Sequence, residues 1–114
     1  VLQTTFNGGE ADGFIAHINK NGQQIFQSTY YGYGDYDQCY FVELDKGNNV
    51  YVFGQADNSG TNFIRNATYN KPNGGQFITK FTPTLDSIVW STSFGRGIGV
   101  TDISPTAFLV DVCS

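Results

Sequence analysis

The sequence is poor in several residue types, and each shortage excludes a class of site. It has 114 residues, with no methionine, three prolines, one histidine and two cysteines. Zinc sites commonly take about four ligands from histidine and cysteine, so this composition argues against one. A single pair of cysteines also provides no disulfide framework. We therefore expect neither a zinc centre nor a fold held together by several disulfides.

Charge and long apolar runs are also scarce. Charged residues make up 14% of the chain, and the formal net charge is −4. The six basic residues are scattered, so they form no electrostatic footprint for nucleic acid. No run approaches the roughly 18 apolar residues of a membrane-spanning helix. Residues 1–6 have neither the charged n-region nor the apolar h-region of a signal peptide. We expect either that a signal peptide has been removed or that the chain is an internal piece of a longer protein.

Aromatic residues and glycine are abundant, at 16% of the chain and 14 residues. This combination is typical of short strands joined by tight turns, and no segment has a sustained helical period. Asn21-Gly22 predicts a hairpin turn, because both residues tolerate positive φ. Seven strands would by themselves fit an immunoglobulin-like sandwich. The expected strands are residues 13–20, 24–30, 39–44, 50–54, 76–81, 87–93 and 107–112.

An internal repeat favours a different architecture. Residues 13–34 align without gaps on residues 76–97, an offset of 63. The identical pairs are Phe14/Phe77, Ile15/Ile78, Ile25/Ile88, Ser28/Ser91, Thr29/Thr92, Gly32/Gly95 and Gly34/Gly97. Such a period predicts stacked supersecondary units. A unit of four short antiparallel strands is the blade of a β-propeller.

Three stretches resemble one family. LDKGNNVYVFG (44–54) resembles the D-x-x-G-N-x-Y-V-x-G core of the bacterial β-propeller repeat called the SBBP repeat. Residues 6–37 resemble its second half, G-G-x-D-x-F-[IV]-A-K-[LI]-N-x-x-G followed by Y-S-T-Y-x-G-G. VTDISPTAFLVDVC (100–113) is similar to propellers in large secreted proteins of gliding, type IX-secreting Bacteroidota.

The resemblance implies an all-β chain of propeller blades. Residues 1–37 would be the outer half of a preceding blade, and residues 38–97 a complete blade with a long loop at 55–75. Residues 98–114 would begin a following blade with its first strand, so we expect the chain to be a segment of a larger propeller.

The resemblance also implies a role. It implies a non-enzymatic structural or interaction module, extracellular or at the cell surface in association with the outer membrane, and cargo of type IX secretion linked to gliding or adhesion. Its expected partners are the remaining blades, proteins of the secretion or gliding machinery, and glycans. The alternative is a carbohydrate-binding or carbohydrate-active propeller.

The repeat separates shared residues, which we expect to be structural, from unshared ones. Ser28-Thr29, Ser91-Thr92 and the turn residues Asp45 and Asp111 recur, and we expect them to bond to nearby backbone. Unshared residues in the loops that follow residues 24–30 and 87–93 are the candidates for contact with a protein or a glycan, with ordinary packing over a blade edge as the alternative for the tyrosines. The candidates are Tyr33, Asp35, Tyr36 and Arg96.

Other candidate chemistry is sparse. Asp35 and Asp37 are weak calcium candidates, with solvated turn carboxylates as the alternative, and no other cofactor is expected. No residue is expected to be catalytic, since His17 is predicted to lie on an exposed strand face rather than in a serine–histidine–acid site. Ser87, in Asp86-Ser87-Ile88, resembles the short O-glycosylation pattern of Bacteroidota.

The two cysteines are not expected to pair. Cys39 lies six residues before Asp45, whereas Cys113 lies two residues after the matching Asp111. In aligned strands this offset of eight residues corresponds to about 26 Å. A disulfide requires Cα atoms about 4.4–6.8 Å apart. We therefore predict no Cys39–Cys113 bridge.

Overall fold

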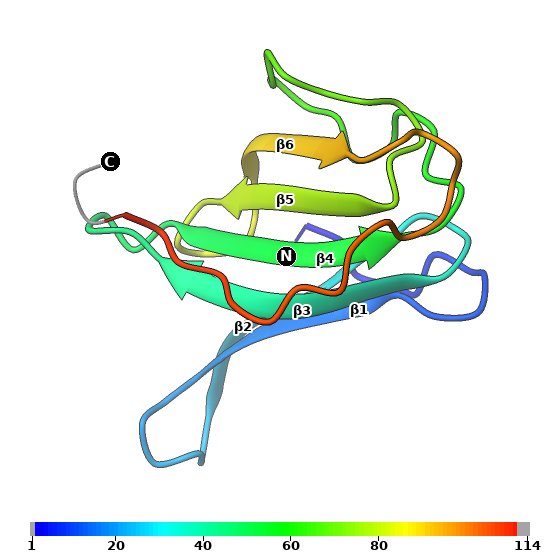
Figure 1. The fold of residues 1–114 in the computed structure, drawn as a ribbon. Helices are drawn as coiled ribbons and strands as arrows, with labels where there is room; N and C mark the ends of the chain where they lie inside the picture. Colours follow the sequence, from blue (N-terminus) through cyan, green and yellow to red (C-terminus); the bar gives the residue numbers. More distant parts are fainter. Residues whose placement is uncertain (1, 112–114) are drawn as a thin grey trace.

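The computed structural model describes residues 2–111 as two antiparallel β-sheets, with no helix among them (Figure 1). The smaller sheet is a hairpin of two strands, and the larger sheet contains four strands in the order β3-β4-β5-β6. The all-β prediction is therefore confirmed. The strands are β1 (Gly13–Ile18), β2 (Ile25–Tyr31), β3 (Asp37–Leu44), β4 (Val50–Ala56), β5 (Gln76–Phe81) and β6 (Ile88–Phe94).

Six of the seven expected strands are present, with ends that differ by up to two residues. The strand expected over residues 107–112 is the exception: residues 107–111 form no strand, and Val112 lies outside the described residues. A strand forms only where its backbone pairs with a neighbouring strand. This segment instead lies on a face of the larger sheet, where the ring of Phe108 packs 5.6 Å from that of Phe53.

The sequence repeat is also a repeat of backbone pairing. In the first hairpin Gly13 pairs with Tyr31, and in β5–β6 the residues 63 positions later, Gln76 and Phe94, pair in the same way. The agreement continues along both hairpins. Each has one register shift, after His17 in β1 and after Lys80 in β5, again 63 residues apart.

Both hairpins close with the same turn. The amide of Gly22 donates to the carbonyl of Asn19 (2.9 Å), and that of Leu85 to the carbonyl of Thr82 (3.0 Å). Gly22 and Leu85 have positive φ, 74° and 58°. The prediction that Asn21 shares this conformation is wrong. The turn is centred one residue earlier, because the Asn19 side chain accepts from the amides of residues 23 and 24 and so closes a longer loop.

Tyr31 joins the two sheets. It is fully buried, and its ring lies 5.4 Å from Phe77 and 4.9 Å from Phe81 of β5. Its hydroxyl lies 2.7 Å from Thr79 Oγ1 and 3.2 Å from Ser91 Oγ. An aromatic side chain buries a large apolar area, and the two hydroxyl partners satisfy its polar end. The first hairpin is therefore packed on one face of the larger sheet.

The long loop between β4 and β5 is part of the core rather than a solvated excursion. Phe63 is fully buried, with its ring stacked 4.4 Å from that of Phe77. Arg65 and Ser91 exchange two backbone hydrogen bonds of 2.8 Å, and the amide of Lys71 donates to Ser93. These bonds cover the outer edge of β6, which would otherwise expose unpaired backbone groups.

Candidate functional site

The unshared candidate residues lie in two loops that follow β2 and β6. The structure brings these loops together at one end of the molecule, on the right in Figure 1. Asn58 connects them: its backbone amide donates to the carbonyl of Gly99 (2.9 Å), and its side-chain amide donates to Asp35 (2.9 Å). Asp35 is therefore a contact between loops as well as a candidate for binding.

The two tyrosines of the first loop are less open than expected of binding residues. The ring of Tyr33 lies 4.8 Å from that of Phe63, and the Arg65 guanidinium carbon lies 6.0 Å from its centre. Burial raises the pKa of Tyr33. Tyr36 is half-buried, and its carbonyl accepts from the amide of Asp57. The first loop thus presents little aromatic surface.

The second loop presents a cation. The side chain of Arg96 is 68% exposed and forms an ion pair with Asp102. Asp102 also accepts from the backbone amide of Arg96 at 2.8 Å. The backbone bond is the largest cause, followed by the side-chain bond, of a pKa of Asp102 below its ordinary value. Arg96 therefore completes its own loop and remains accessible on one side.

The first loop also has a carboxylate that accepts from a loop amide, as that of Asp102 does in the second loop. Asp37 accepts from the amide of Tyr33 at 2.7 Å, and Tyr33 is the counterpart of Arg96 at the offset of 63. Sequence analysis did not find this correspondence. The available signal was that G-x-G is followed by an aspartate in both YGYGDYD and FGRGIGVTD. The extra residues in the second loop displace the aspartate from the ungapped alignment.

The two loop carboxylates are in different electrostatic surroundings. Asp37 is only 2% exposed, and burial raises its pKa to about 6, although the Tyr33 amide opposes the shift and the charges of Asp12, Asp35 and Asp57 add to it. A Cβ at Gly32 would lie 2.3 Å from Asp12 Oδ1 and 2.8 Å from Asp37 Oδ2, so both carboxylates approach this glycine. Asp12 Oδ1 is buried without a hydrogen-bond partner.

The two calcium candidates have separate partners. Asp35 accepts from the side chain of Asn58, and Asp37 accepts from the amide of Tyr33. Across residues 2–111, no three side chains of His, Cys, Asp or Glu form a group that could hold a metal ion.

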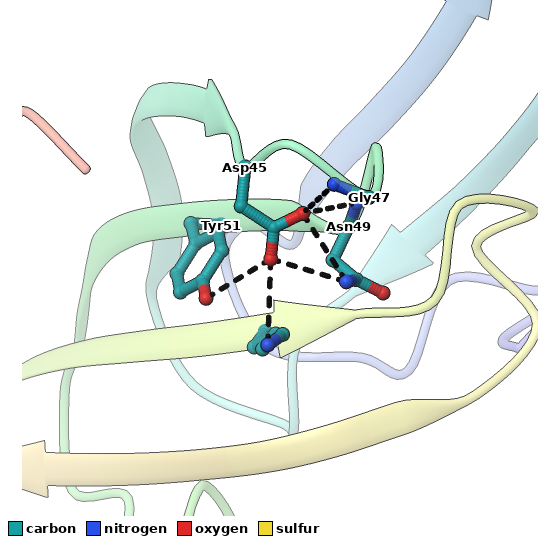
Figure 2. Close-up of polar contacts among 5 residues, drawn as sticks. Asp45, Gly47, Asn49 and Tyr51 are labelled. Atoms are coloured by element: carbon teal, nitrogen blue, oxygen red, sulfur yellow. Dashed lines mark hydrogen bonds and ion pairs between the residues drawn. The ribbon is translucent and has the colours of Figure 1, made fainter. Parts of the chain in front are cut away.

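Asp45 is the centre of the most highly bonded turn (Figure 2). Its Oδ1 accepts from the amides of Gly47 (2.9 Å) and Asn49 (3.0 Å). Its Oδ2 accepts from the Tyr51 hydroxyl (3.3 Å) and lies 3.4 Å from Lys80 Nζ. Desolvation opposes ionisation, but the bonds from Asn49, Gly47 and Lys80 outweigh it and lower the pKa of Asp45 to about 2. Its predicted role as an acceptor for its own turn is confirmed; for Asp111 that role stays a prediction.

Three of the recurring hydroxyls bond to backbone, as predicted. Thr29 Oγ1 accepts from the amide of Gln3 at 2.9 Å. Ser91 Oγ donates to the carbonyl of Phe63, and Thr92 Oγ1 to the carbonyl of Tyr69. These groups therefore hold neighbouring segments against β2 and β6.

Three further residues are placed individually. His17 is exposed, as predicted, and its ring bonds to Gln27 (3.1 Å). Ser87 is exposed, and its carbonyl accepts from Thr82 in the β5–β6 turn. Cys39 has no disulfide partner among residues 2–111, and burial raises the pKa of its thiol to about 12. Cys113 lies outside the described residues, so the absence of a bridge between them stays a prediction.

Comparison with known proteins gives no independent indication of function. No family model, no curated protein and no solved structure matches the chain. No helix among residues 2–111 is long and apolar enough to cross a membrane.

Proposed function

We propose that the chain is a segment of a β-propeller and acts as a non-enzymatic structural and interaction module. One observation carries this proposal: β1–β2 and β5–β6 have the same pairing register at an offset of 63, and the first hairpin packs on the sheet that contains the second. Repeated units that bury one another's faces are the physical basis of repeat architectures.

The larger sheet supports the blade assignment. Its four strands follow one another in sequence order, each antiparallel to the next. The first hairpin would correspond to the outer two strands of a neighbouring blade. The carboxylates of Asp37, Asp45 and Asp102 each accept backbone amides of their own loop or turn, which supports a structural role for them. Location outside the cell and export by type IX secretion belong to this proposal through the resemblance to SBBP repeats.

A structure of the complete gene product tests the blade assignment. We expect further four-stranded sheets arranged around one axis, each stacked on the next as the first hairpin stacks on β3–β6. A closed sandwich of two sheets would overturn the assignment.

A glycan panel separates the structural role from the carbohydrate-binding and carbohydrate-active alternative. We expect no glycan to raise the melting temperature of the chain, and no glycan to be hydrolysed. A glycan that stabilises the wild type and Tyr69→Ala but not Tyr36→Ala would overturn the proposal in favour of carbohydrate binding. Release of hydrolysis products would show an enzyme.

A further inference from the structure

The sequence contains three asparagine–glycine pairs. In such a pair the backbone nitrogen of the glycine can attack the side-chain carbonyl carbon of the asparagine, and glycine hinders this approach least because it has no Cβ. The pairs are Asn7-Gly8, Asn21-Gly22 and Asn73-Gly74. Their surroundings in the fold differ, so the structure separates pairs that are held in place from a pair that can react.

The first pair is held by hydrogen bonds of its asparagine. Asn7 Nδ2 donates to Gln3 Oε1 (3.0 Å) and to the carbonyl of Gly32 (2.9 Å). The backbone amide of Asn7 donates to the carboxylate of Asp12. Rotation of the side-chain amide toward Gly8 would break both side-chain bonds, and their stabilising contribution would be lost. Folding therefore protects Asn7.

The third pair is enclosed by neighbouring loops. Asn73 Oδ1 accepts from the amide of Gly60 (3.2 Å), and the backbone carbonyl of Asn73 accepts from the amide of Gly99 (2.9 Å). Gly74 is buried, and its amide donates to the carbonyl of Lys71 (3.1 Å). Both the attacking nitrogen and the carbon it would attack are therefore fixed inside the fold.

The second pair lies in the turn between β1 and β2, at the end of a ribbon that projects from the rest of the molecule at the lower left of Figure 1. Residues 20–26 are all exposed, and the Asn21 side chain makes no hydrogen bond within residues 2–111. The amide of Gly22 donates to the carbonyl of Asn19 (2.9 Å). One hydrogen bond thus holds the attacking nitrogen, and a turn with few contacts opens at a small cost in free energy.

The exposure of Asn21 does not depend on the absence of a neighbouring unit. Its counterpart at the offset of 63 is Thr84, in a turn with the same closing hydrogen bond. The first hairpin packs on the unit that contains Thr84, and the adjacent Leu85 is only 1% exposed. Thr84 is nevertheless exposed. A unit packed in the same way on the first hairpin would therefore leave Asn21 exposed.

We propose that Asn21 is a site of spontaneous modification, at which the folded chain converts asparagine to aspartate and isoaspartate. The backbone nitrogen of Gly22 bonds to Asn21 Cγ as the Cγ–Nδ2 bond breaks, and the side-chain nitrogen leaves as ammonia with the proton of the Gly22 amide. Water then opens the cyclic imide, and no oxidant or reductant takes part. Cleavage between the nitrogen and Cγ gives aspartate, whereas cleavage between the nitrogen and the main-chain carbonyl carbon gives isoaspartate.

Both products change the first hairpin alone. Each adds one negative charge, and isoaspartate also adds one atom to the main chain between residues 21 and 22. The turn closes through the hydrogen bond from Gly22 to Asn19, which a longer main chain displaces. The second hairpin has Thr84-Leu85 at these positions and cannot react in this way. The modification therefore makes the two equivalent units differ as the protein ages.

Peptide mapping by mass spectrometry tests this site on the intact chain at neutral pH. The rate at each asparagine in the folded chain is divided by its rate in the same chain unfolded in guanidinium chloride, which is the matched control. We expect folding to slow Asn7 and Asn73 about tenfold more than Asn21, because their hydrogen bonds must also break.

A substitution separates the turn from the rest of the chain. Asn21→Thr gives the first turn the residue type of Thr84, and it should remove the modification from this turn. The slow rates at Asn7 and Asn73 should not change, and circular dichroism establishes that the variant is folded.

Two results would overturn the inference: equal slowing of all three pairs by folding, or an Asn21 that reacts in the unfolded chain alone. Neither would affect the blade assignment, which the structure of the complete gene product tests separately.

Discussion

Two carboxylates in this protein respond to pH in opposite directions because their surroundings differ. Asp45 accepts hydrogen bonds from its own turn and lies beside Lys80, which lowers its pKa to about 2. Asp37 is buried close to Asp12, which raises its pKa to about 6. The first group stabilises the fold when it is ionised, and the second when it is protonated.

Substitution of Asp45 should lower stability above pH 4. Its folded pKa is below the unfolded value, so its contribution is present above about pH 4 and is lost as the pH falls toward 2. We expect Asp45→Asn to lower the urea midpoint at pH 7 more than Asp86→Asn does, since Asp86 is exposed and accepts from threonine side chains, whereas Asp45 accepts from two turn amides and lies beside Lys80. Equal effects of the two substitutions would show that the Asp45 turn is not specially stabilised.

Substitution of Asp37 should weaken the pH dependence of stability at pH values just above those at which Asp45 acts. Its folded pKa is above the unfolded value, so its contribution is fully present below about pH 4 and is lost as the pH rises through 6. We expect the urea midpoint of the wild type to fall between pH 4.5 and pH 7, and that of Asp37→Asn to fall less. Identical slopes would mean that Asp37 titrates normally.

At the scale of elements, the β1–β2 turn requires a left-handed residue at its fourth position. Gly22 has a φ of 74°, and nothing lies within 4 Å of where its Cβ would be. We expect Gly22→Ala to cost about 1–2 kcal/mol of unfolding free energy through conformation alone. Gly22→Asn should cost less, because asparagine tolerates this conformation. A larger cost for asparagine in urea unfolding would contradict the turn geometry.

The long loop between β4 and β5 should contribute to stability through Phe63. Because this ring is fully buried between Tyr31 and Phe77, we expect Phe63→Ala to cost about 3–5 kcal/mol of unfolding free energy. Tyr69→Ala, in the same loop but 70% exposed, is the control and should cost less than about 0.5 kcal/mol. If chemical denaturation showed that the two variants lose similar unfolding free energies, Phe63 would lie outside the core.

The sequence predicted the regular elements better than the loops. Alternation and turn residues located six strands, and the offset of 63 anticipated the shared register of the two hairpins. The burial of Phe63 was not predictable, because most of the long loop around it is polar and only tertiary contacts with Tyr31, Tyr33 and Phe77 enclose its ring. The expected strand at residues 107–112 failed because strand residues alone do not provide a pairing partner.

The candidate site was predicted in part. The filter of shared and unshared residues correctly placed Ser91, Thr92 and Asp45 in structural roles. It left open whether Tyr33 contacts a ligand or packs as an ordinary aromatic, since position in a loop does not reveal which way a ring points; in the structure the ring packs on Phe63. It also missed the common role of Asp37 and Asp102, because the insertion in the second loop shifts their alignment.

At the scale of the whole molecule, the central claim is that the chain contains two equivalent units stacked face to face. The most direct measurement is a set of NMR nuclear Overhauser contacts on the intact chain. We predict the same cross-strand pattern in β1–β2 and β5–β6, displaced by 63 residues, together with contacts from the Tyr31 ring to Phe77 and Phe81. Different registers in the two hairpins, or no contact from Tyr31 to β5, would contradict it.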